Sequence, residues 1–571
     1  MQALPPELER LRTMSSPKTR YDLHPVAVVE STHIEGADSL LSVEAQANLR
    51  ENGRLIVDFG EEAVGQFRID GLAEGAGELI ASYGEDLEEA RRTKDFTCGW
   101  YKHPQDRLRV GPGAFSVVTP GRRAGRYLAL RLETGRLQLH RIVFEARHYE
   151  LSQRGRFACS DPQLEAIWSI SERTTRLCMQ EFYEDGIKRD GLLWIGDYRV
   201  QYLCNAWLYG DSFLAAKSLA MMATAQEDDG LLPACASKGG GHQHPDNINY
   251  MPGVPHNSVD KWMLLNYSAD FVSGILEYLW HSGDLETARH LWPFALRTAR
   301  RLCVVPEAET PGHPWITDNP NPDEPAGWWP SRGALDYQRL WAVRDARTLA
   351  TLIGKAPEGL PSEKDLGVLI EGLLRRYAGQ AYLLDVGDRH KRNRHMNAMA
   401  VLSGSVQEQE ARSILRAVAD DSAAKRPTSG FMEYWWLSAC VQANLRSLAL
   451  SELRRYWGLM VNNNANTCWE ICHPDEKGIR RFETHALSHC HGWSAGPVVL
   501  LPRILLGIEP LSPGWRKVRI APDLHDLEWA EVDIPTPQGW LHVRAERGKG
   551  ESVHLDIATP PNVTPIQEEN A

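Results

Sequence analysis

The residues best suited to chemistry lie in one short segment, Asp185 to Asp197, which reads Asp-Gly-Ile-Lys-Arg-Asp-Gly-Leu-Leu-Trp-Ile-Gly-Asp. Its three carboxylates surround a Lys-Arg pair, and its three glycines are poor helix interior residues, so a loop leading into a helix is predicted. Repulsion between carboxylates this close can raise the pKa of one until it stays protonated near neutral pH. A protonated carboxyl beside ionised ones is what acid-catalysed cleavage of a glycosidic bond requires.

A second segment of interest, Asn466-Thr-Cys-Trp-Glu-Ile, follows a predicted helix that ends near Met460. Glu470 in this segment directly follows an aromatic residue and lies 280 positions after Asp190. A Trp-Glu pair alone is weak evidence, because a glutamate that merely pairs with an arginine looks the same. The segment becomes informative only together with the first one.

Length and composition describe a globular chain of several domains. The 571 residues are 43% hydrophobic and 24% charged, which predicts two to four domains with a large core. The net charge of −12, without basic runs, argues against nucleic acid or anionic lipid as a partner. The sequence contains no apolar stretch of about 18 residues, so no membrane span is predicted. The first residues lack the apolar core of a signal peptide and the ten cysteines show no disulfide spacing, so a cytoplasmic location is expected.

Cysteines and histidines crowd together in the C-terminal half, at Cys468, Cys472, His473, His489, Cys490 and His491. Cys-x3-Cys followed by histidine fits no standard zinc spacing, so buried thiols beside polar histidines are expected, with a metal site as the alternative.

Two further features are expected around a ligand site. Fifteen of the nineteen tryptophans lie between Trp168 and Trp493; core packing explains most, and some are expected to stack on pyranose rings. The long loop over 236–258, rich in glycine and histidine, is expected to form a wall of the site.

The pattern of polar and apolar residues changes twice along the chain and, with a loose tail at the start, predicts four segments. After a loose tail over 1–20, short runs of alternating polarity over 21–155 predict an antiparallel, jelly-roll-like N-terminal β-sandwich. Residues 156–507 contain about twelve helical segments, which suit an (α/α)6 barrel; a helical solenoid is the alternative, although no fixed repeat is visible. Residues 508–571 return to strand patterns and predict a small C-terminal β-sheet domain.

Three local signals fix parts of the helical region. Ser160-Asp161-Pro162 predicts a helix start, and Ser405 with Glu408 predicts a capping box. Apolar residues three and four apart predict one helix with a single buried stripe, at Leu285, Ala288, Trp292, Ala295, Ala299 and Leu302.

The central and C-terminal regions, from about residue 155 to 525, resemble glycoside hydrolase family 78, the inverting α-L-rhamnosidases. That family carries Asp-x-x-x-Arg-Glu followed by Gly-Trp-x-Gly-Asp, which is matched here by Asp185, Arg189, Asp190, Trp194, Gly196 and Asp197. Its Thr-x-Trp-Glu motif is matched by Thr467, Trp469 and Glu470. Two less specific matches are Arg394-His395-Met-Asn397 and Ser488-His-Cys-His491-Gly-Trp-Ser.

The resemblance implies a division of labour between two carboxyl groups. Asp190 would protonate the leaving oxygen and Glu470 would activate a water molecule on the opposite ring face, with the carboxyls roughly 6.5–9.5 Å apart. The resemblance also implies no metal or organic cofactor. The remaining matched residues would bind the sugar: Asp185, Arg189, Trp194, Asp197, His395, Trp469 and His491.

This chain departs from the family pattern at three positions. Most members carry glutamate where Asp190 stands, so the chain is similar to the short bacterial members that use aspartate; Gly191 and Leu193 also differ. The expected function is therefore exo-hydrolysis of terminal rhamnose, with a carbohydrate as partner and a homodimer as a candidate assembly. The alternatives are a hydrolase of another α-linked sugar, a catalytically inactive sugar-binding relative and a metal-dependent enzyme built on the Cys-His cluster.

Simple structural explanations also stand beside each predicted site residue. The alternative for Asp185 and Asp197 is that they are loop and cap residues, for Arg189 that it bridges Asp185 and Asp190, and for the two histidines that they are core residues.

Overall fold

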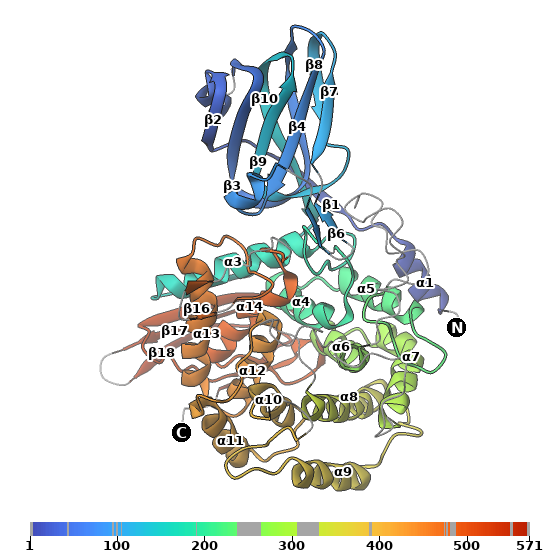
Figure 1. The fold of residues 1–571 in the computed structure, drawn as a ribbon. Coiled ribbons are helices and arrows are strands. Elements are labelled where there is room, and N and C mark those ends of the chain that lie inside the picture. The colour runs from blue at the N-terminus through green and yellow to red at the C-terminus, as the bar shows by residue number, and fades with distance from the viewer. Residues whose placement is uncertain are drawn as a thin grey trace.

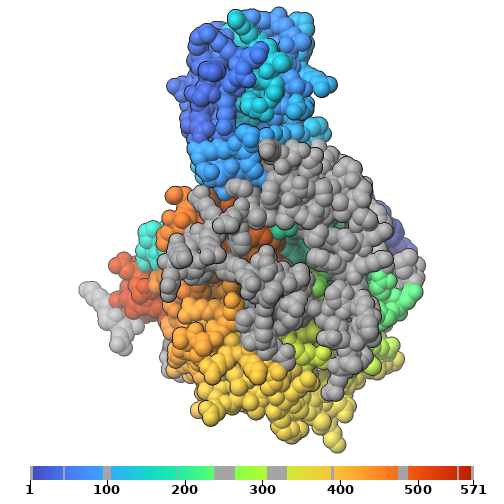
Figure 2. Space-filling model, viewed as in Figure 1, coloured from blue at the N-terminus to red at the C-terminus, as the bar shows by residue number. Residues whose placement is uncertain are grey.

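The computed structural model describes residues 4–42, 45–93, 96–98, 101–103, 105–189, 191–236, 264–304, 331–386, 391–472, 474–475, 478–479, 487–548 and 552–567. A β-domain stands on a helical domain, and a smaller β-sheet packs against the flank of the helices (Figure 1). Figure 2 shows the same division into two lobes in space-filling form. The predicted class, with an N-terminal β-domain, a helical domain and a C-terminal β-domain, is confirmed.

The N-terminal β-domain is organised around one long strand, β3, which bends near Asp58. Strands β2 and β9 pair mainly with its first part and β8 with its second part, whereas β10 pairs with both parts, so the sheet folds over its own core. The register of β10 against β3 is antiparallel in both stretches, Arg136 to Leu139 against Arg50 to Ala47 and Arg141 to Ala146 against Asp70 to Gly65, as the alternation of polarity predicted. The strands are β1 Lys18–Leu23, β2 Ala27–Glu35, β3 Ala47–Ala73, β4 Gly77–Gly84, β5 Phe96–Cys98, β6 Tyr101–His103, β7 Asp106–Val110, β8 Gly113–Val118, β9 Arg123–Thr134 and β10 Arg136–Tyr149.

The prediction of a loose tail over 1–20 is wrong for its described part. Helix α1 (Pro6–Thr13) packs on α5 (Phe213–Thr224), and Leu8 is completely buried there. Ser16 donates a hydrogen bond to the backbone oxygen of Glu181, and β1 pairs with β10. Long-range packing therefore orders a segment that has little local preference for structure.

The helical domain is a closed ring of helix pairs. Within its described ranges, twelve α-helices follow one another from α3 to α14, and the even-numbered ones contact each other in the order α4, α6, α8, α10, α12, α14 and back to α4. A solenoid would leave this ring open, so the predicted (α/α)6 barrel is confirmed. The helices not yet bounded are α3 Pro162–Cys178, α4 Ile195–Leu208, α6 Leu265–Ser282, α7 Leu285–Cys303, α8 Arg332–Ile353, α9 Glu363–Arg376, α10 Arg394–Leu402, α11 Glu408–Asp420, α12 Gly430–Gln442, α13 Arg446–Asn462 and α14 Pro497–Leu505.

Burial separates the inner helices from the outer ones. Every residue of α4 is buried, as expected for a helix surrounded by protein on all sides. Outer helix α11 buries only one stripe, Ala411, Ile414, Leu415 and Val418. The inner ring can therefore present side chains to a site at one end of the barrel.

Two of the three local helix signals are confirmed. Helix α3 begins at Pro162, and the Asp161 carboxylate caps it by accepting a hydrogen bond from Gln163 N at 2.9 Å. Helix α7 buries the predicted stripe except Leu285, which is 39% exposed. The capping box is wrong, because α11 begins at Glu408 with Gln407 as its N-cap and no side-chain cap bond.

The C-terminal region forms two small sheets against the helices. One contains β11 (Arg156–Cys159), β16 (Trp529–Thr536), β17 (Gly539–Arg547) and β18 (Val553–Ala558), so a strand that precedes the barrel pairs with the end of the chain. The other contains β14 (Glu509–Pro510), β15 (Lys517–Ile520) and β19 (Thr564–Gln567). Among the described residues, no helix has the length and apolar character needed to cross a membrane.

Candidate active site

The segment from Asp185 to Asp197 folds as predicted, as a loop between α3 and α4. The Asp185 carboxylate closes this loop by accepting a hydrogen bond from Leu192 N at 2.9 Å. Gly191 N donates to Gly186 O at 3.1 Å, and Gly191 has φ +70°, a conformation that favours glycine. Asp190 itself lies outside the described residues, so the predicted separation between its carboxyl group and that of Glu470 stays a prediction.

The loop is joined directly to the strand-like segment around His491. Gly186 and His491 form an antiparallel bridge, and Gly492 N donates to Asp185 O at 2.6 Å. The two segments are adjacent in space although about 300 residues separate them in sequence. Their backbone pairing fixes where the Asp185 and His491 side chains can point.

Glu470 is buried in the same place and is held by donors from two directions. Arg189 Nη2 lies 2.9 and 3.0 Å from its two carboxylate oxygens. Ser488 N donates to Glu470 Oε2 at 2.9 Å. A guanidinium and a backbone amide therefore hold this carboxylate in place from two sides. Arg189 therefore pairs with the second predicted segment, 281 residues away, and not only within its own loop.

His491 lies between two further carboxyl groups. Its Nε2 is 3.7 Å from Asp185 Oδ2, and its Nδ1 is 3.7 Å from Asp197 Oδ1. Burial, and then the positive charge of Arg189, lower the pKa of His491 well below its usual value. The imidazole is therefore neutral at neutral pH.

Asp197 lies in the first turn of α4 and has negative charges as neighbours. Burial, and then the negative charges of Asp185 and Glu470, raise its pKa well above the usual range. Tyr267 on α6 is its neighbour, with the hydroxyl 3.4 Å from Asp197 Oδ2. Gly196 leaves room for this tyrosine, because a Cβ there would lie 2.2 Å from the ring.

Two polar atoms in this cluster are buried without a hydrogen-bond partner among the described residues, Asp197 Oδ1 and His491 Nδ1. Their separation of 3.7 Å is too long for a hydrogen bond between them. Buried polar groups are normally satisfied, so these two atoms are suited to a hydroxylated ligand.

The predicted aromatic residues surround this cluster. Trp194 is buried with its ring edge-on to Tyr267, 6.4 Å between centroids. Trp469 is half-buried and lies 5.3 Å from the ring of His489. Trp493, which the sequence analysis did not single out, donates from Nε1 to Glu470 O at 3.0 Å and lies 4.3 Å from the His491 ring.

His395 lies in the first turn of inner helix α10 and is 5% exposed. Burial, and then the charges of Lys425 and Arg394, lower its pKa to about 3. It is therefore a neutral histidine on the inner ring.

The cysteines of the Cys-His cluster are buried thiols, as expected, at Cys468, Cys472 and Cys490. Burial raises the pKa of Cys468 to about 12, and its sulfur lies 3.4 Å from Ser171 Oγ. His473 and the loop from residue 237 to 263 lie outside the described residues. In the described ranges, no group of three or more His, Cys, Asp or Glu side chains is arranged to hold a metal ion.

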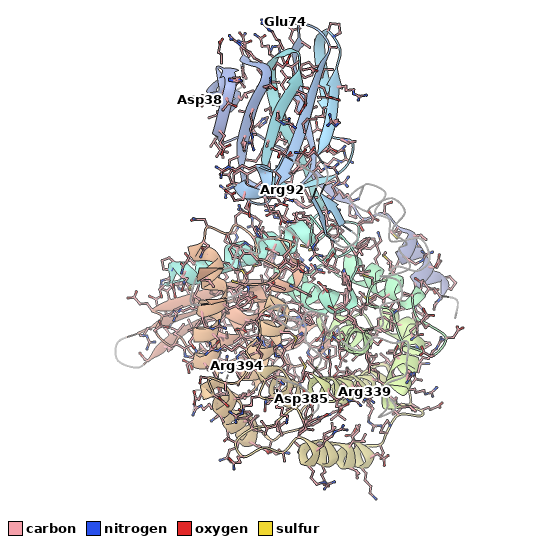
Figure 3. The ribbon with its side chains drawn as sticks, viewed as in Figure 1. Asp38, Glu74, Arg92, Arg339, Asp385 and Arg394 are labelled. Atoms are coloured by element: carbon pink, nitrogen blue, oxygen red, sulfur yellow. The ribbon has the colours of Figure 1, made fainter. Side chains whose placement is uncertain are left out.

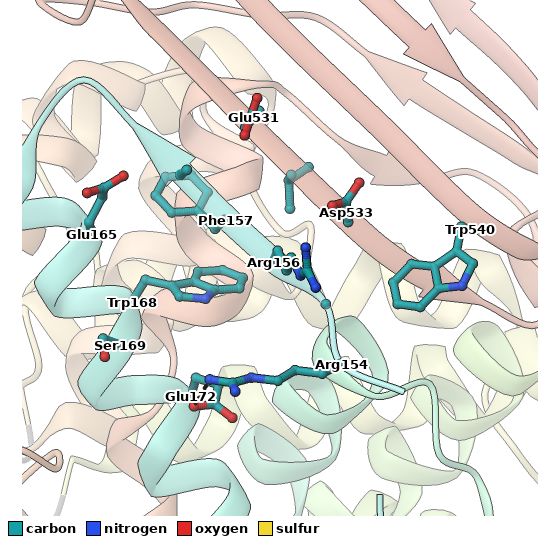
Figure 4. Close-up of a pocket in the computed structure, with 13 residues that line it drawn as sticks. Arg154, Arg156, Phe157, Glu165, Trp168, Ser169, Glu172, Glu531, Asp533 and Trp540 are labelled. Atoms are coloured by element: carbon teal, nitrogen blue, oxygen red, sulfur yellow. Dashed lines mark hydrogen bonds and ion pairs between the residues drawn. The ribbon is translucent and has the colours of Figure 1, made fainter. Parts of the chain in front are cut away.

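A separate cavity of about 990 Å³ opens between α3 and the C-terminal sheet (Figure 4). Trp168 and Trp540 line it from opposite sides, and its Arg154 pairs with its Glu172 at 2.9 Å. None of the predicted site residues lines this cavity, so it is distinct from the cluster around Glu470.

Two segments of the sequence are similar to known protein families. The bacterial alpha-L-rhamnosidase 6 hairpin glycosidase domain matches residues 152–257, which include the Asp185–Asp197 loop. The bacterial alpha-L-rhamnosidase C-terminal domain matches residues 507–566. No curated protein matches the sequence at a significant level.

Solved structures share the fold over most of the chain. A family 78 rhamnosidase of Bacillus sp. GL1 is 25% identical, with a TM-score of 0.77 over 93% of this chain and 55% of that protein. A Klebsiella oxytoca rhamnosidase, solved with rhamnose bound, is 24% identical, with a TM-score of 0.69 over 88% of this chain and 99% of that one. The Streptomyces avermitilis α-L-rhamnosidase, complexed with L-rhamnose, is 16% identical, with a TM-score of 0.71 over 96% of this chain and 50% of that one.

This chain thus spans about half the length of the Bacillus and Streptomyces proteins and nearly all of the Klebsiella protein. The two matched domains and the shared fold confirm the resemblance that the motifs indicate, to the α-L-rhamnosidases of glycoside hydrolase family 78.

Proposed function

We propose that this protein is an exo-acting α-L-rhamnosidase, which hydrolyses terminal α-L-rhamnose from glycosides or oligosaccharides with inversion at the anomeric carbon. One observation carries the proposal: Arg189 and Glu470, from the two segments that resemble the family motifs, form an ion pair in one buried site. The matched rhamnosidase domains give the substrate class its support. The cytoplasmic location and the homodimer are predictions from sequence alone.

Glu470 is the proposed general base. Its carboxylate accepts hydrogen bonds from Arg189 and Ser488 N, which orient it to accept a proton from water. The attack of this water on the anomeric carbon breaks the glycosidic bond, and the proton passes to Glu470.

Asp190 is the proposed general acid, which gives its proton to the leaving oxygen. Its support comes from the sequence, since it directly follows Arg189 in the segment that matches the family. The inverting arrangement requires a separation of roughly 6.5–9.5 Å between the two carboxyl groups, so that water fits beside the sugar.

The remaining residues are proposed to bind rhamnose. Asp197 Oδ1 and His491 Nδ1, which lack partners among the described residues, are suited to hydroxyl groups of the sugar. Asp185 lies on the other side of the His491 ring, next to Nε2. Trp194 and Trp469 offer apolar surface to the ring, and His395 completes the inner wall.

The decisive test is proton NMR of the first sugar anomer formed during hydrolysis of p-nitrophenyl α-L-rhamnoside. We expect the β-anomer to appear first and the α-anomer to follow only by mutarotation. Retention of configuration would overturn the inverting mechanism. A panel of nitrophenyl glycosides tests which sugar is hydrolysed. Preference for another α-linked sugar would show that rhamnose is not the substrate. Rhamnose binding without hydrolysis would indicate a catalytically inactive relative.

A further inference from the structure

The N-terminal β-domain meets the helical domain through a cluster of buried charges. Three glutamates of the β-domain face Lys188 of the Asp185–Asp197 loop: Glu62, Glu85 and Glu89, exposed by 2, 6 and 1%. Arg92, labelled in Figure 3 at this junction, pairs with Glu89 at 3.0 Å. A buried ionic cluster is a costly way to join two domains, because its charges must be desolvated. Its position beside the candidate active site suggests another use.

Glu85, which directly follows β4, is the centre of this cluster. Its carboxylate lies 2.7 Å from Lys188 Nζ. It accepts one hydrogen bond from Ser488 Oγ at 3.0 Å and another from His489 N at 2.7 Å. All three donors belong to the segments that build the candidate active site.

Two of the residues that contact Glu85 are linked to Glu470 directly or through the next residue in the chain. Ser488 donates its hydroxyl to Glu85 and its backbone N–H to Glu470, so one residue bridges the two carboxylates. Lys188 directly precedes Arg189, whose guanidinium donates to both oxygens of Glu470. The two donor residues that hold Glu470 are thus anchored, directly or through a neighbour, by one carboxylate from another domain.

The charges of the cluster are arranged so that Glu85 stays ionised. Burial raises its pKa, but Lys188, His489 and a hydrogen bond from Glu62 outweigh burial and bring it to about 2. Burial, and then the charge of Glu85, raise the pKa of Glu62 well above its usual value. Glu62 is therefore protonated at neutral pH and donates to Glu85, and Thr467 Oγ1 donates to Glu62 Oε2 at 3.2 Å.

We propose that Glu85 is a positioning residue for the proposed rhamnosidase reaction: it fixes Ser488 and Lys188, and through them the general base Glu470. The β-domain is then part of the catalytic apparatus and not a separate module. This inference rests on the proposed function for its kinetic consequence and on geometry alone for its structural one.

The test is Glu85→Gln in the full-length protein, which keeps the shape of the side chain and removes its charge. We expect kcat for p-nitrophenyl α-L-rhamnoside to fall about 10- to 100-fold, because small misplacements of a catalytic group are costly. KM should change by less than about twofold, because Glu85 touches no proposed sugar-binding atom. Hydrogen exchange at the Ser488 and His489 amides should become faster, because His489 loses a charged acceptor and Ser488 loses its anchor.

Two matched controls separate positioning from loss of stability. Asp106→Asn removes a buried β-domain carboxylate that pairs with Arg123 at 2.7 Å, inside its own domain. Glu61→Gln removes a carboxylate that crosses the same junction to Arg173 at 3.4 Å. Both should retain kcat and the exchange rates of the Ser488 and His489 amides in the folded protein.

The outcomes are distinct. Wild-type kcat in folded Glu85→Gln with unchanged exchange, or equal losses in Asp106→Asn, would overturn the inference. Where Glu85→Gln does not fold, Ser488→Ala removes only the hydroxyl link and should still lower kcat about tenfold; full activity there counts against positioning. An inactive wild-type enzyme refutes the proposed function instead, and the exchange rates alone then decide the role of Glu85.

Discussion

Glu470 and Asp197 are both buried carboxyl groups of one site, but their neighbours differ. Glu470 accepts hydrogen bonds from the guanidinium of Arg189 and from Ser488 N. Asp197 faces the charges of Asp185 and Glu470, and its pKa is raised well above the usual range. Burial alone therefore does not set the environment of a carboxyl group, because the nearest donors and charges also act on it. Two buried carboxyls with different neighbours can then take different roles.

Replacing each acid by its amide is the sharpest test of this comparison, and Glu470→Gln should have the largest effect. The amide cannot accept a proton from water, so kcat should fall by about 10²- to 10⁴-fold. Steady-state kinetics measures the loss, and the thermal midpoint shows whether the variant is folded. Turnover near that of the wild type in a folded variant would remove Glu470 from the mechanism.

The second test removes Arg189, the ion-pair partner of Glu470. Arg189→Met leaves this carboxylate buried with Ser488 N as its main donor, and kcat should fall about 10- to 100-fold. Arg189→Lys is the matched variant, because it keeps the positive charge and loses only the second oxygen contact. It should recover part of kcat; equal losses in both would show that shape, not charge, is what Arg189 supplies.

Asp197→Asn should be the mildest of the three active-site changes. Because Asp197 is already neutral, the amide has nearly the same shape and charge, and Tyr267 can still donate to its oxygen. We expect kcat/KM to fall by less than about tenfold and the thermal midpoint to stay close to that of the wild type. Asp197→Ala removes the polar group and should raise KM more. An Asp197→Asn variant as damaged as Glu470→Gln would mean that Asp197 acts as an anion.

The architecture was predictable from sequence because its signals are local and periodic. The Asp161 cap and the stripe of α7 gave their helices correctly. The main error arose where distant residues decide the structure. Helix α1 is ordered by burial of Leu8 against the barrel, which no local signal in the first twenty residues indicates.

The site followed the same division. The motifs indicated Asp185, Arg189, Asp197 and Glu470 as members of one site, and the structure brings these four together. The partner of Arg189, 281 residues away, could not be assigned from spacing. Glu85 had no signal at all, because a lone glutamate after a strand becomes significant only when another domain packs on it. Ser488 and Trp493 lie in a segment that matches the family, and this match is the signal that indicates them.

The domain junction contains a second pair of buried carboxyl groups with different properties, Glu62 and Glu85. Its test has the smallest expected effect. Glu62 is kept protonated beside ionised Glu85. When the pH rises above the ordinary glutamate value of about 4.5, the unfolded chain releases this proton while the folded chain keeps it. The contribution of Glu62 to stability therefore falls with rising pH, by up to about 1.4 kcal/mol per pH unit, until its raised folded pKa is passed.

Glu62→Gln has no proton to release, and its amide can still donate to Glu85. The variant should therefore gain on the wild type in free energy of unfolding as the pH is raised from 5 to 8, measured by urea unfolding at each pH. Glu61→Gln, one position earlier and partly exposed, should follow the wild-type pH dependence. Parallel curves for Glu62→Gln and the wild type would show that Glu62 is ionised in the folded protein, and the contrast between the two carboxyls at the junction would be lost.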